Sequence, residues 1–586
     1  MKALDVGTLA GMFWKRVQTS GGDTAFRVRE PDGGFSQRTW AWLGEEVRRL
    51  SGAWIAAGLR EEERVALLAP STIDWIIAEW SIISAGGVSV PLFSTLRADE
   101  TADYLVEAGV SWALVDSAER AEELRGLVAA RTSQVPRFIV LNEALTALRA
   151  GSEPAGMPGA GGMETAASHE AEAAARWSRI GPDRLATIAC TSGTTGRPKG
   201  VMLTHANYLA LLRALPSAGI LHENLRETGV LLFLPFPHSF ARLILLASCM
   251  YGIPVALSDP KTLRDDAKLL QPGLIPSVPL VYQRMYEGTM NALRSAPPSR
   301  RRMGERALAI GRLAARHLER SGRMPLWLRP LHATAERLVL RKIRAALGLS
   351  RIHVLLSGSV AIPPAVQEFF AALGLPLLEG YGSTETAGAV TCNPLGRARS
   401  GTVGKPLEGV TLRVADDGEI LARGDMIAQR YTSSQLIRNQ EGWFATGDSG
   451  YIDPDGYLVL TGRKQDLIKT LQGKRVIPYP IEARLEEHAA IEFAILIGEG
   501  RTFVSALLCL APGVEATDAV HKEVAAWIAQ VNSSLAPHEQ IQRHMVLPES
   551  LSVQNGLMTA SLKVRRSAVC GRFAALIEEL YQRGTR

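Results

Sequence analysis

Short aliphatic runs alternate with helical patterns along most of the chain, and this alternation constrains the fold more than any other feature. Residues 64–69 and 112–116 have the β-branched and aliphatic composition of buried strands. Helical patterns lie between such runs, and residues 42–57 are one example. Because strands separated by helices pair in parallel, we predict an α/β fold built on parallel sheets.

The length of the chain implies more than one domain. At 586 residues it is too long for one ordinary hydrophobic core. A Gly/Asp-rich stretch ends near Gly462, and residues 464–586 have the size of a small independent domain. We therefore predict an N-terminal region over 1–463 and a C-terminal domain over 464–586. The Ala-, Gly- and Glu-rich residues 150–175 have weak periodicity and are predicted to form a surface loop or linker.

Bulk properties indicate a cytoplasmic protein. The formal charge of +6 is small for this length and does not argue for a nucleic-acid partner. The five cysteines are scattered without a CxxC or Cys/His cluster, which favours buried free thiols over disulfides or zinc. The most apolar region, 230–257, is interrupted by prolines, His238 and Arg242, so it fails the criterion of about 18 apolar residues for a membrane span.

Residues 300–344 are rich in arginine, and their Leu and Ile spacing predicts amphipathic helices. Two interpretations remain open. The commoner one is a solvated helical face. The other is a basic amphipathic surface that contacts an anionic membrane, which would make the protein peripherally membrane-associated.

The sharpest local motif is residues 191–200, Thr-Ser-Gly-Thr-Thr-Gly-Arg-Pro-Lys-Gly, after an apolar strand candidate at 185–189. Small residues let backbone N–H groups approach phosphate oxygens, hydroxyls add donors, and a lysine supplies a point charge. The GxxxxGK[ST] spacing of a Walker A loop is absent. The candidate phosphate-binding residues are Thr191, Ser192, Gly193, Thr194, Thr195, Gly196 and Lys199.

This motif resembles the phosphate loop of the adenylate-forming superfamily, which includes acyl-CoA synthetases, luciferases and adenylation domains. The resemblance extends from Thr39 to Lys563, nearly the whole chain. It implies a large N-terminal region of packed sheets and a small, mobile α+β C-terminal domain. It also implies ATP, Mg²⁺ and coenzyme A as cofactor and co-substrates.

Residues 379–386, Glu-Gly-Tyr-Gly-Ser-Thr-Glu-Thr, resemble the adenine motif of that superfamily. By this resemblance Tyr381 stacks on adenine, the neighbouring Gly382 is part of the nucleotide site, and Thr384 contacts the α-phosphate. Glu385 would ligate Mg²⁺, together with Thr194, because a hard carboxylate oxygen suits this ion.

Three further residues complete the resemblance. Asp448 would accept hydrogen bonds from the ribose hydroxyls, with Arg463 beside it. Lys563 corresponds to the catalytic lysine near the C-terminus, although this chain has Leu562 where many members have glycine. Arg565 and Arg566, which follow, are interpreted as surface charge.

The remaining candidates lie on the acid side and at the hinge. His238 matches a substrate-side motif in which an aromatic or histidine lies near the acid carboxylate, and a purely structural histidine is nearly as plausible. Gly358 lies where members often read Ser-Gly-Gly-Ala-Pro, and is assigned to the nucleotide. Lys464 and Gln465 occupy the hinge, where members carry Asp or Lys at the second position.

These motifs predict an acid–thiol ligase that activates a medium- or long-chain fatty acid and transfers it to coenzyme A. The long insert at 300–347 resembles the long-chain branch. A rival interpretation keeps the adenylation and delivers the acyl group to an acyl carrier protein, which Gln465 favours somewhat. A third is a nucleotide- or acyl-binding sensor without turnover.

Overall fold

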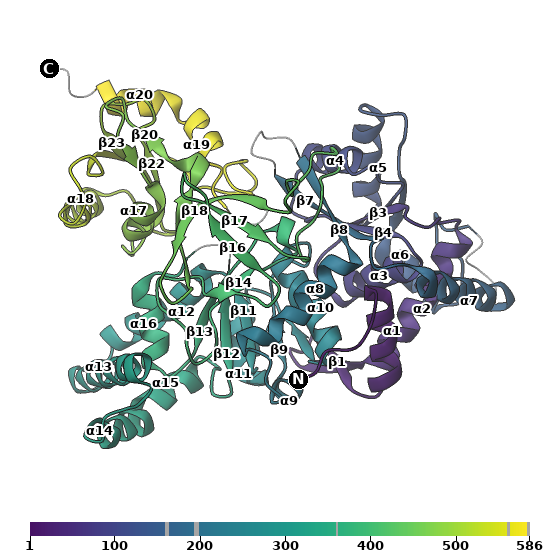
Figure 1. Cartoon of the computed structure of the whole chain (residues 1–586), viewed down its shortest axis with the longest axis horizontal. Helices are drawn as coiled ribbons and strands as arrows, with labels where there is room; N and C mark the ends of the chain where they lie inside the picture. The colour runs from purple at the N-terminus through teal and green to yellow at the C-terminus, as the bar shows by residue number, and fades with distance from the viewer. Residues whose placement is uncertain (159–162, 193–197, 359–360, 560–562, 583–586) are drawn as a thin grey trace. The chain divides into compact units, whose positions relative to one another are not determined.

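The computed structural model describes residues 1–158, 163–192, 198–358, 361–559 and 563–582. Backbone contacts divide the chain into two compact units (Figure 1). The first comprises Met1–Thr411 and Ala422–Phe444, and the second Leu412–Leu421 and Ala445–Arg586. A large region of packed sheets followed by a smaller α+β region confirms the predicted fold class. The functional boundary after Arg463 stays a prediction.

A six-stranded sheet in the first unit has the order β6-β5-β3-β4-β7-β8. Its neighbours pair in parallel except β7 and β8, which are antiparallel. Helix α2 (Trp40–Ala56) packs beside α3 (Ile73–Ser84), and the Thr39 hydroxyl caps α2 by accepting from the Trp42 amide at 3.2 Å. The predicted strands and helix are thereby confirmed. The strands are β3 (Arg64–Leu68), β4 (Val88–Pro91), β5 (Trp112–Val115), β6 (Arg137–Val140), β7 (Leu185–Ser192) and β8 (Pro198–Thr204).

The loop predicted over 150–175 is wrong in its second half, which forms helix α7 (Met163–Arg179). Alanine and glutamate are strong helix formers, and they outweigh the weak hydrophobic periodicity that suggested a linker. Packing completes the explanation, because α7 lies against α2 and Ala173 is buried.

A nine-stranded sheet with the order β15-β14-β13-β12-β11-β9-β10-β1-β2 completes the first unit. Its middle strands, from β13 to β1, pair in parallel, and the outer strands at both edges are antiparallel. The strands are β1 (Thr24–Arg29), β2 (Phe35–Thr39), β9 (Val230–Leu232), β10 (Val255–Leu257), β11 (Leu274–Ser277), β12 (Val354–Ser357), β13 (Leu377–Tyr381), β14 (Thr391–Cys392) and β15 (Lys405–Pro406).

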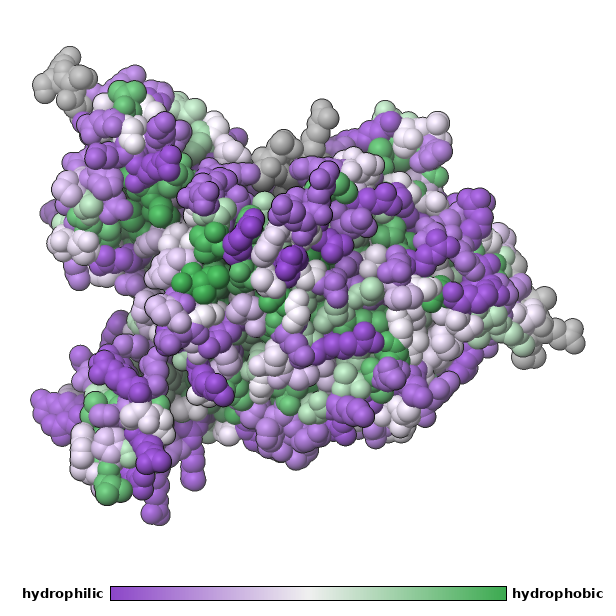
Figure 2. All heavy atoms as spheres, in the orientation of Figure 1, coloured by the Kyte–Doolittle hydropathy of each residue, from purple (hydrophilic) through white to green (hydrophobic). Residues whose placement is uncertain are grey.

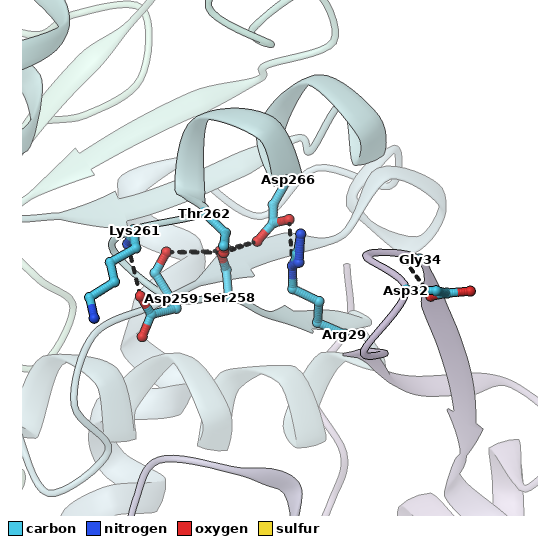
Figure 3. A network of polar contacts seen from close by, with 8 residues as sticks. All are labelled: Arg29, Asp32, Gly34, Ser258, Asp259, Lys261, Thr262 and Asp266. Atoms are coloured by element: carbon cyan, nitrogen blue, oxygen red, sulfur yellow. Dashed lines mark hydrogen bonds and ion pairs between the residues drawn. The ribbon is translucent and has the colours of Figure 1, made fainter.

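A buried carboxylate fixes one end of this sheet to helix α11 (Leu263–Leu270) (Figure 3). Asp266 is 1% exposed and accepts hydrogen bonds from the hydroxyls of Ser258 and Thr262, both at 2.7 Å. It also pairs with Arg29 Nε at 3.2 Å, on strand β1. A buried charge is tolerated only when it is paired and hydrogen-bonded in this way, so Asp266 joins β1, the end of β10 and α11.

The arginine-rich residues form helices, as predicted: α13 (Pro298–Ser321), α14 (Leu328–Ala335) and α15 (Arg341–Ala346). A single π-helical turn, η2 (Glu336–Leu340), joins α14 to α15. Helix α13 packs on α16 (Pro364–Ala372) and on α14. Within the described ranges, no helix combines the length and apolarity needed to cross a bilayer.

The second unit carries three small sheets. The four-stranded sheet β16-β17-β18-β19 lies mostly in this unit, with a two-stranded sheet β20-β21 and a three-stranded sheet β22-β23-β24. Five of these strands are β16 (Thr411–Val414), β20 (Ile468–Lys469), β21 (Arg475–Val476), β23 (Val504–Leu510) and β24 (Ile541–Val546). The strands that matter for the site are β17 (Glu419–Arg423), β18 (Phe444–Ile452) and β19 (Leu458–Arg463). Helix α17 (Pro478–Leu485) packs on β22 (Ile491–Ile497).

Candidate active site

Strands β7 and β8 form a hairpin whose ends carry the predicted phosphate motif. Thr191 pairs with Lys199 across the hairpin, and its hydroxyl donates to the Lys199 carbonyl at 3.3 Å. A Cβ on Gly200 would lie 2.6 Å from Ile188 Cγ2 and 2.7 Å from Thr432 Cγ2, so glycine is required there. The Ser192 backbone pairs with Pro198. The central predicted ligands Gly193, Thr194, Thr195 and Gly196 lie outside the described residues.

Tyr431 joins the phosphate hairpin to the adenine motif, although the two are far apart in the sequence. Its hydroxyl donates to Glu385 Oε1 at 2.9 Å, and Lys199 Nζ lies 5.3 Å from the centre of its ring. Lys199 Nζ also donates to Gln435 Oε1 at 3.4 Å. Burial, and then the Glu385 carboxylate, raise the pKa of Tyr431, so its hydroxyl stays protonated and remains a donor.

The backbone on both sides holds Tyr431 and Glu385 in register. Tyr431 pairs with Val201 in an isolated antiparallel bridge, and the Thr432 amide donates to the Gly200 carbonyl at 2.8 Å. The Ala428 amide donates to the Glu385 carbonyl at 2.8 Å. The predicted phosphate-binding lysine, Lys199, and the predicted Mg²⁺ ligand, Glu385, are therefore both positioned by one short segment, residues 428–432.

The adenine motif begins in β13 and continues into a tight turn after that strand ends. In the single turn η3 (Thr384–Thr386), the Ser383 amide donates to Thr386 Oγ1 at 2.9 Å and the Thr386 amide donates to the Ser383 carbonyl at 3.2 Å. A side chain on Gly382 would collide with the backbone of Gly388. Tyr381, Thr384 and Glu385 are each half-buried, so all three have an accessible surface at this turn.

On the acid side, the parallel pairing of β12 with β13 places Gly358 beside the adenine motif. A Cβ on Gly358 would contact the Phe240 ring at 3.7 Å and the Gly380 carbonyl at 3.8 Å. His238 is the N-cap of helix α10 (Ser239–Tyr251), and its Nδ1 accepts from the Phe240 amide at 3.2 Å. His238 therefore has a structural role at the start of α10, and a role near the acid carboxylate stays a prediction.

Glu379 is a buried carboxyl to which the sequence assigned no role. It is 4% exposed, accepts from the Ile362 amide at 3.0 Å and is hydrogen-bonded by Gln367. Burial raises the pKa of Glu379 to about 7. Because Glu379 is the first residue of the adenine motif, its hydrogen bond from Ile362 fixes the start of that motif against the segment that follows β12.

In the second unit, strands β18 and β19 bring the two predicted ribose residues together. Asp448 and Arg463 are directly paired across the strands, and Arg463 Nε lies 3.2 Å from Asp448 Oδ1. The Asp448 side chain is 12% exposed and that of Arg463 is 56% exposed. Gly447, at φ +74°, turns the chain before Asp448, and its amide donates to Glu419 Oε1 at 2.9 Å.

The predicted hinge is tied to the same sheet. Lys464 Nζ lies 2.5 Å from Asp417 Oδ2 and 2.8 Å from Glu419 Oε2. Its hydrogen bonds to Asp417 and then to Glu419 raise the pKa of Lys464. Gln465 follows in an exposed turn, η4 (Lys464–Asp466). The sequence analysis did not identify the two acidic partners, which lie more than forty residues earlier.

The predicted catalytic lysine lies in the second unit, next to an isolated antiparallel bridge between Met558 and Val564. The Lys563 amide donates to Thr559 Oγ1 at 3.0 Å, and the Thr559 amide donates to the Lys563 carbonyl at 2.8 Å. Lys563 is exposed. The interpretation of Arg566 as surface charge is wrong, because it donates to both Glu482 oxygens at 2.6 and 2.8 Å, with its side chain 25% exposed. That ion pair fixes the segment after Lys563 to helix α17.

The chemistry of Glu385 fits a divalent cation carried by a nucleotide. No cluster of three or more His, Cys, Asp and Glu side chains able to hold a metal exists among the residues that the structure describes. A single half-buried carboxylate beside Lys199 and Tyr431 suits Mg²⁺, which keeps several waters and is usually held by one or two carboxylates plus substrate phosphates.

Comparison with known proteins identifies the family of the chain. The family model described as AMP-binding enzyme matches residues 13–432, and the model of the AMP-binding enzyme C-terminal domain matches 465–585. The chain is 32% identical to the long-chain-fatty-acid–CoA ligase FadD15 of Mycobacterium bovis, over 94% of this chain and 93% of the relative. It is 26% identical to the chloroplastic long-chain-fatty-acid–[acyl-carrier-protein] ligase AEE15 of Arabidopsis thaliana, over 93% and 82%.

Among solved structures, o-succinylbenzoate CoA synthetase MenE of Bacillus subtilis, in complex with its acyl-adenylate intermediate, has the same fold. The TM-score is 0.69 at 21% identity, with 95% of this chain and 97% of the other covered. The chain belongs to the AMP-binding enzyme family, within the adenylate-forming superfamily.

Proposed function

We propose that this enzyme is an AMP-forming fatty acid–CoA ligase that acts on medium- or long-chain fatty acids. The observation that carries the proposal is the arrangement of Lys199 and Glu385 around Tyr431, which presents a cation and a carboxylate beside the phosphate hairpin. The long-chain acyl specificity is supported by the similarity to FadD15, which extends over nearly the full length of both chains.

In the first half-reaction, a carboxylate oxygen of the fatty acid attacks the α-phosphorus of ATP and pyrophosphate leaves. Charge accumulates on phosphate oxygens, so the enzyme's task is to position positive charge and donors. We assign the β- and γ-phosphates to Lys199 and the hairpin, the α-phosphate to Thr384, and the charge developing at the reacting centre to Lys563. Mg²⁺, when bound, would add positive charge to the triphosphate, with Glu385 and Thr194 as its ligands.

The nucleoside is assigned to the residues of the adenine and ribose motifs. Tyr381 would stack on adenine, with Gly382 and Gly358 allowing its close approach, and Asp448 and Arg463 would bind the ribose. In the second half-reaction, the thiol sulfur attacks the acyl carbonyl carbon and AMP leaves. We propose that residues 464–586 form a mobile domain that pivots at Lys464 and Gln465 between the two half-reactions.

Coenzyme A is the acceptor that we favour, and an acyl carrier protein is the second candidate. The similarity to the carrier-protein ligase AEE15, although at lower identity, keeps that candidate, and both acceptors present a thiol on a flexible arm. We place the reaction in the cytoplasm, because ATP and coenzyme A are available there, at a membrane surface where long acyl chains partition.

The test is incubation of the full chain with Mg-ATP, fatty acids of graded length and either coenzyme A or a phosphopantetheinylated carrier protein. We expect AMP and acyl-CoA in equal amounts by mass spectrometry. Lys199→Gln should lower the rate by about 10²–10³, whereas the exposed Lys261→Gln should leave it unchanged. Acyl-carrier protein without acyl-CoA would transfer the proposal to the second acceptor, and ADP as the product would refute both.

A further inference from the structure

The loop before α14, together with α14 and η2, exposes large apolar side chains that water should not solvate well. Leu326 is 76% exposed, Trp327 59%, Leu331 48% and Leu338 46%. Trp327, Leu331 and Leu338 are spaced by four and seven residues, so they lie on one face of the continuous helical segment. We call these four residues the apolar stripe.

Other positions of the same segment are buried, so the stripe belongs to a packed helix and is not an unfolded edge. Leu328, Ala335, Val339 and Leu340 are at most 9% exposed, and α14 packs on α13. This helical hairpin projects from the first unit, and Figure 2 shows apolar residues surrounded by hydrophilic ones over it, at the lower left. The stripe is therefore held outward on a rigid support.

Exposed cations lie on both sides of the stripe in the sequence and are not neutralised. Between residues 320 and 342 the chain has six arginines and lysines and one acid, Glu336, which pairs with Arg344 instead. In the described parts of the chain, none of the six lies within salt-bridge distance of a carboxylate. Most of their positive charge is therefore available to an external partner. The six are Arg320, Arg323, Arg329, Arg337, Arg341 and Lys342.

We propose that the apolar stripe and its six surrounding cations dock the enzyme on an anionic phospholipid bilayer. Leucine side chains enter the boundary between headgroups and acyl chains, tryptophan is favoured at that depth, and each nearby cation adds attraction to the negative leaflet. A second copy of this chain would bring like charges together, and a nucleic acid would not cover Leu326, Leu331 and Leu338. The advantage of docking, access to acyl chains in the membrane, rests on the proposed function.

The experiment is cosedimentation of the full chain with large unilamellar vesicles. One set contains phosphatidylcholine alone, and the other contains 30% phosphatidylglycerol. We expect binding to the anionic vesicles that is at least tenfold tighter and that weakens as salt is raised. The variant Arg337→Gln/Arg341→Gln/Lys342→Gln should bind on the order of 100-fold more weakly, about fivefold for each lost cation.

Two matched controls separate docking from general surface effects. Lys15→Gln/Lys261→Gln/Arg264→Gln removes three exposed cations elsewhere and should bind vesicles like the unmodified chain. Leu331→Ser/Leu338→Ser should bind at least tenfold more weakly, whereas Leu269→Ser, at a residue 60% exposed on α11, should not.

The outcomes are distinct. Equal binding of both vesicle types, or no effect of the stripe and cation variants, would overturn the proposal. No binding to either vesicle type, together with binding of a soluble acidic protein that is lost in Arg337→Gln/Arg341→Gln/Lys342→Gln, would overturn it in favour of a protein partner. Vesicle binding without acyl-CoA formation would support docking and refute the ligase activity, so the two failures are distinguishable.

Discussion

Replacing Tyr431 with phenylalanine removes one hydroxyl and leaves the ring in place. The lost hydrogen bond is the one at 2.9 Å to Glu385, whereas the contact between the ring and Lys199 is kept. A hydrogen bond to a charged group contributes about 1.5–3 kcal/mol. If Glu385 holds Mg²⁺ for adenylation, losing this bond should lower the adenylation rate by about ten- to 100-fold.

Fatty-acid-dependent exchange of pyrophosphate into ATP measures this step without the thiol acceptor. Tyr431→Phe should need a higher Mg²⁺ concentration than the unmodified enzyme, because the carboxylate is no longer oriented, and excess Mg²⁺ should restore part of the rate. Tyr451→Phe is the matched control, since Tyr451 is 53% exposed. Unchanged exchange and Mg²⁺ dependence in Tyr431→Phe would refute the positioning role.

Three further predictions concern catalysis, pH and stability. Lys563→Ala should lower adenylation by at least 10² yet leave thiol transfer from synthetic acyl-adenylate intact, and normal acyl-adenylate formation would remove Lys563 from its assigned role. Because the pKa of Glu379 is raised to about 7, the folded state binds a proton that the unfolded state releases near pH 4.5. The free energy of unfolding of the unmodified enzyme, measured by chemical denaturation, should therefore fall by about 3 kcal/mol more between pH 4.5 and 7 than that of Glu379→Gln. Identical pH profiles of the two proteins would contradict this. Asp266→Ala should lower the free energy of unfolding by about 3 kcal/mol, because it removes the buried carboxylate from its hydrogen bonds and ion pair. The exposed control Asp259→Ala should lower it by less than about 1 kcal/mol. Equal effects of the two variants would contradict a stabilising role of the Asp266 network.

Local sequence patterns were enough to predict the strands, the helices and the resemblance to the adenylate-forming superfamily. The alternation of apolar runs and helical patterns predicted β3, β5 and α2 because each is determined by residues close together in the chain. The linker prediction failed at α7 because it depended on hydrophobic periodicity, and this helix is formed by alanine and glutamate propensity and by packing on α2.

Contacts between distant residues could not be predicted in the same way. Tyr431 follows no recognisable motif, and its importance appears only when residues 199, 385 and 431 are folded together. Arg566 looks like surface charge beside Arg565, and only the position of Glu482 on α17 makes it part of a partly buried ion pair. Such residues depend on tertiary pairing, which a single sequence does not contain.

The most direct test of adenylate formation follows one oxygen atom. A fatty acid labelled with ¹⁸O in its carboxylate is incubated with the enzyme, Mg-ATP and coenzyme A, and the products are read by mass spectrometry. Attack on the α-phosphorus predicts one labelled oxygen in each AMP and none in pyrophosphate. Label in inorganic phosphate, with ADP as the nucleotide product, would contradict the account.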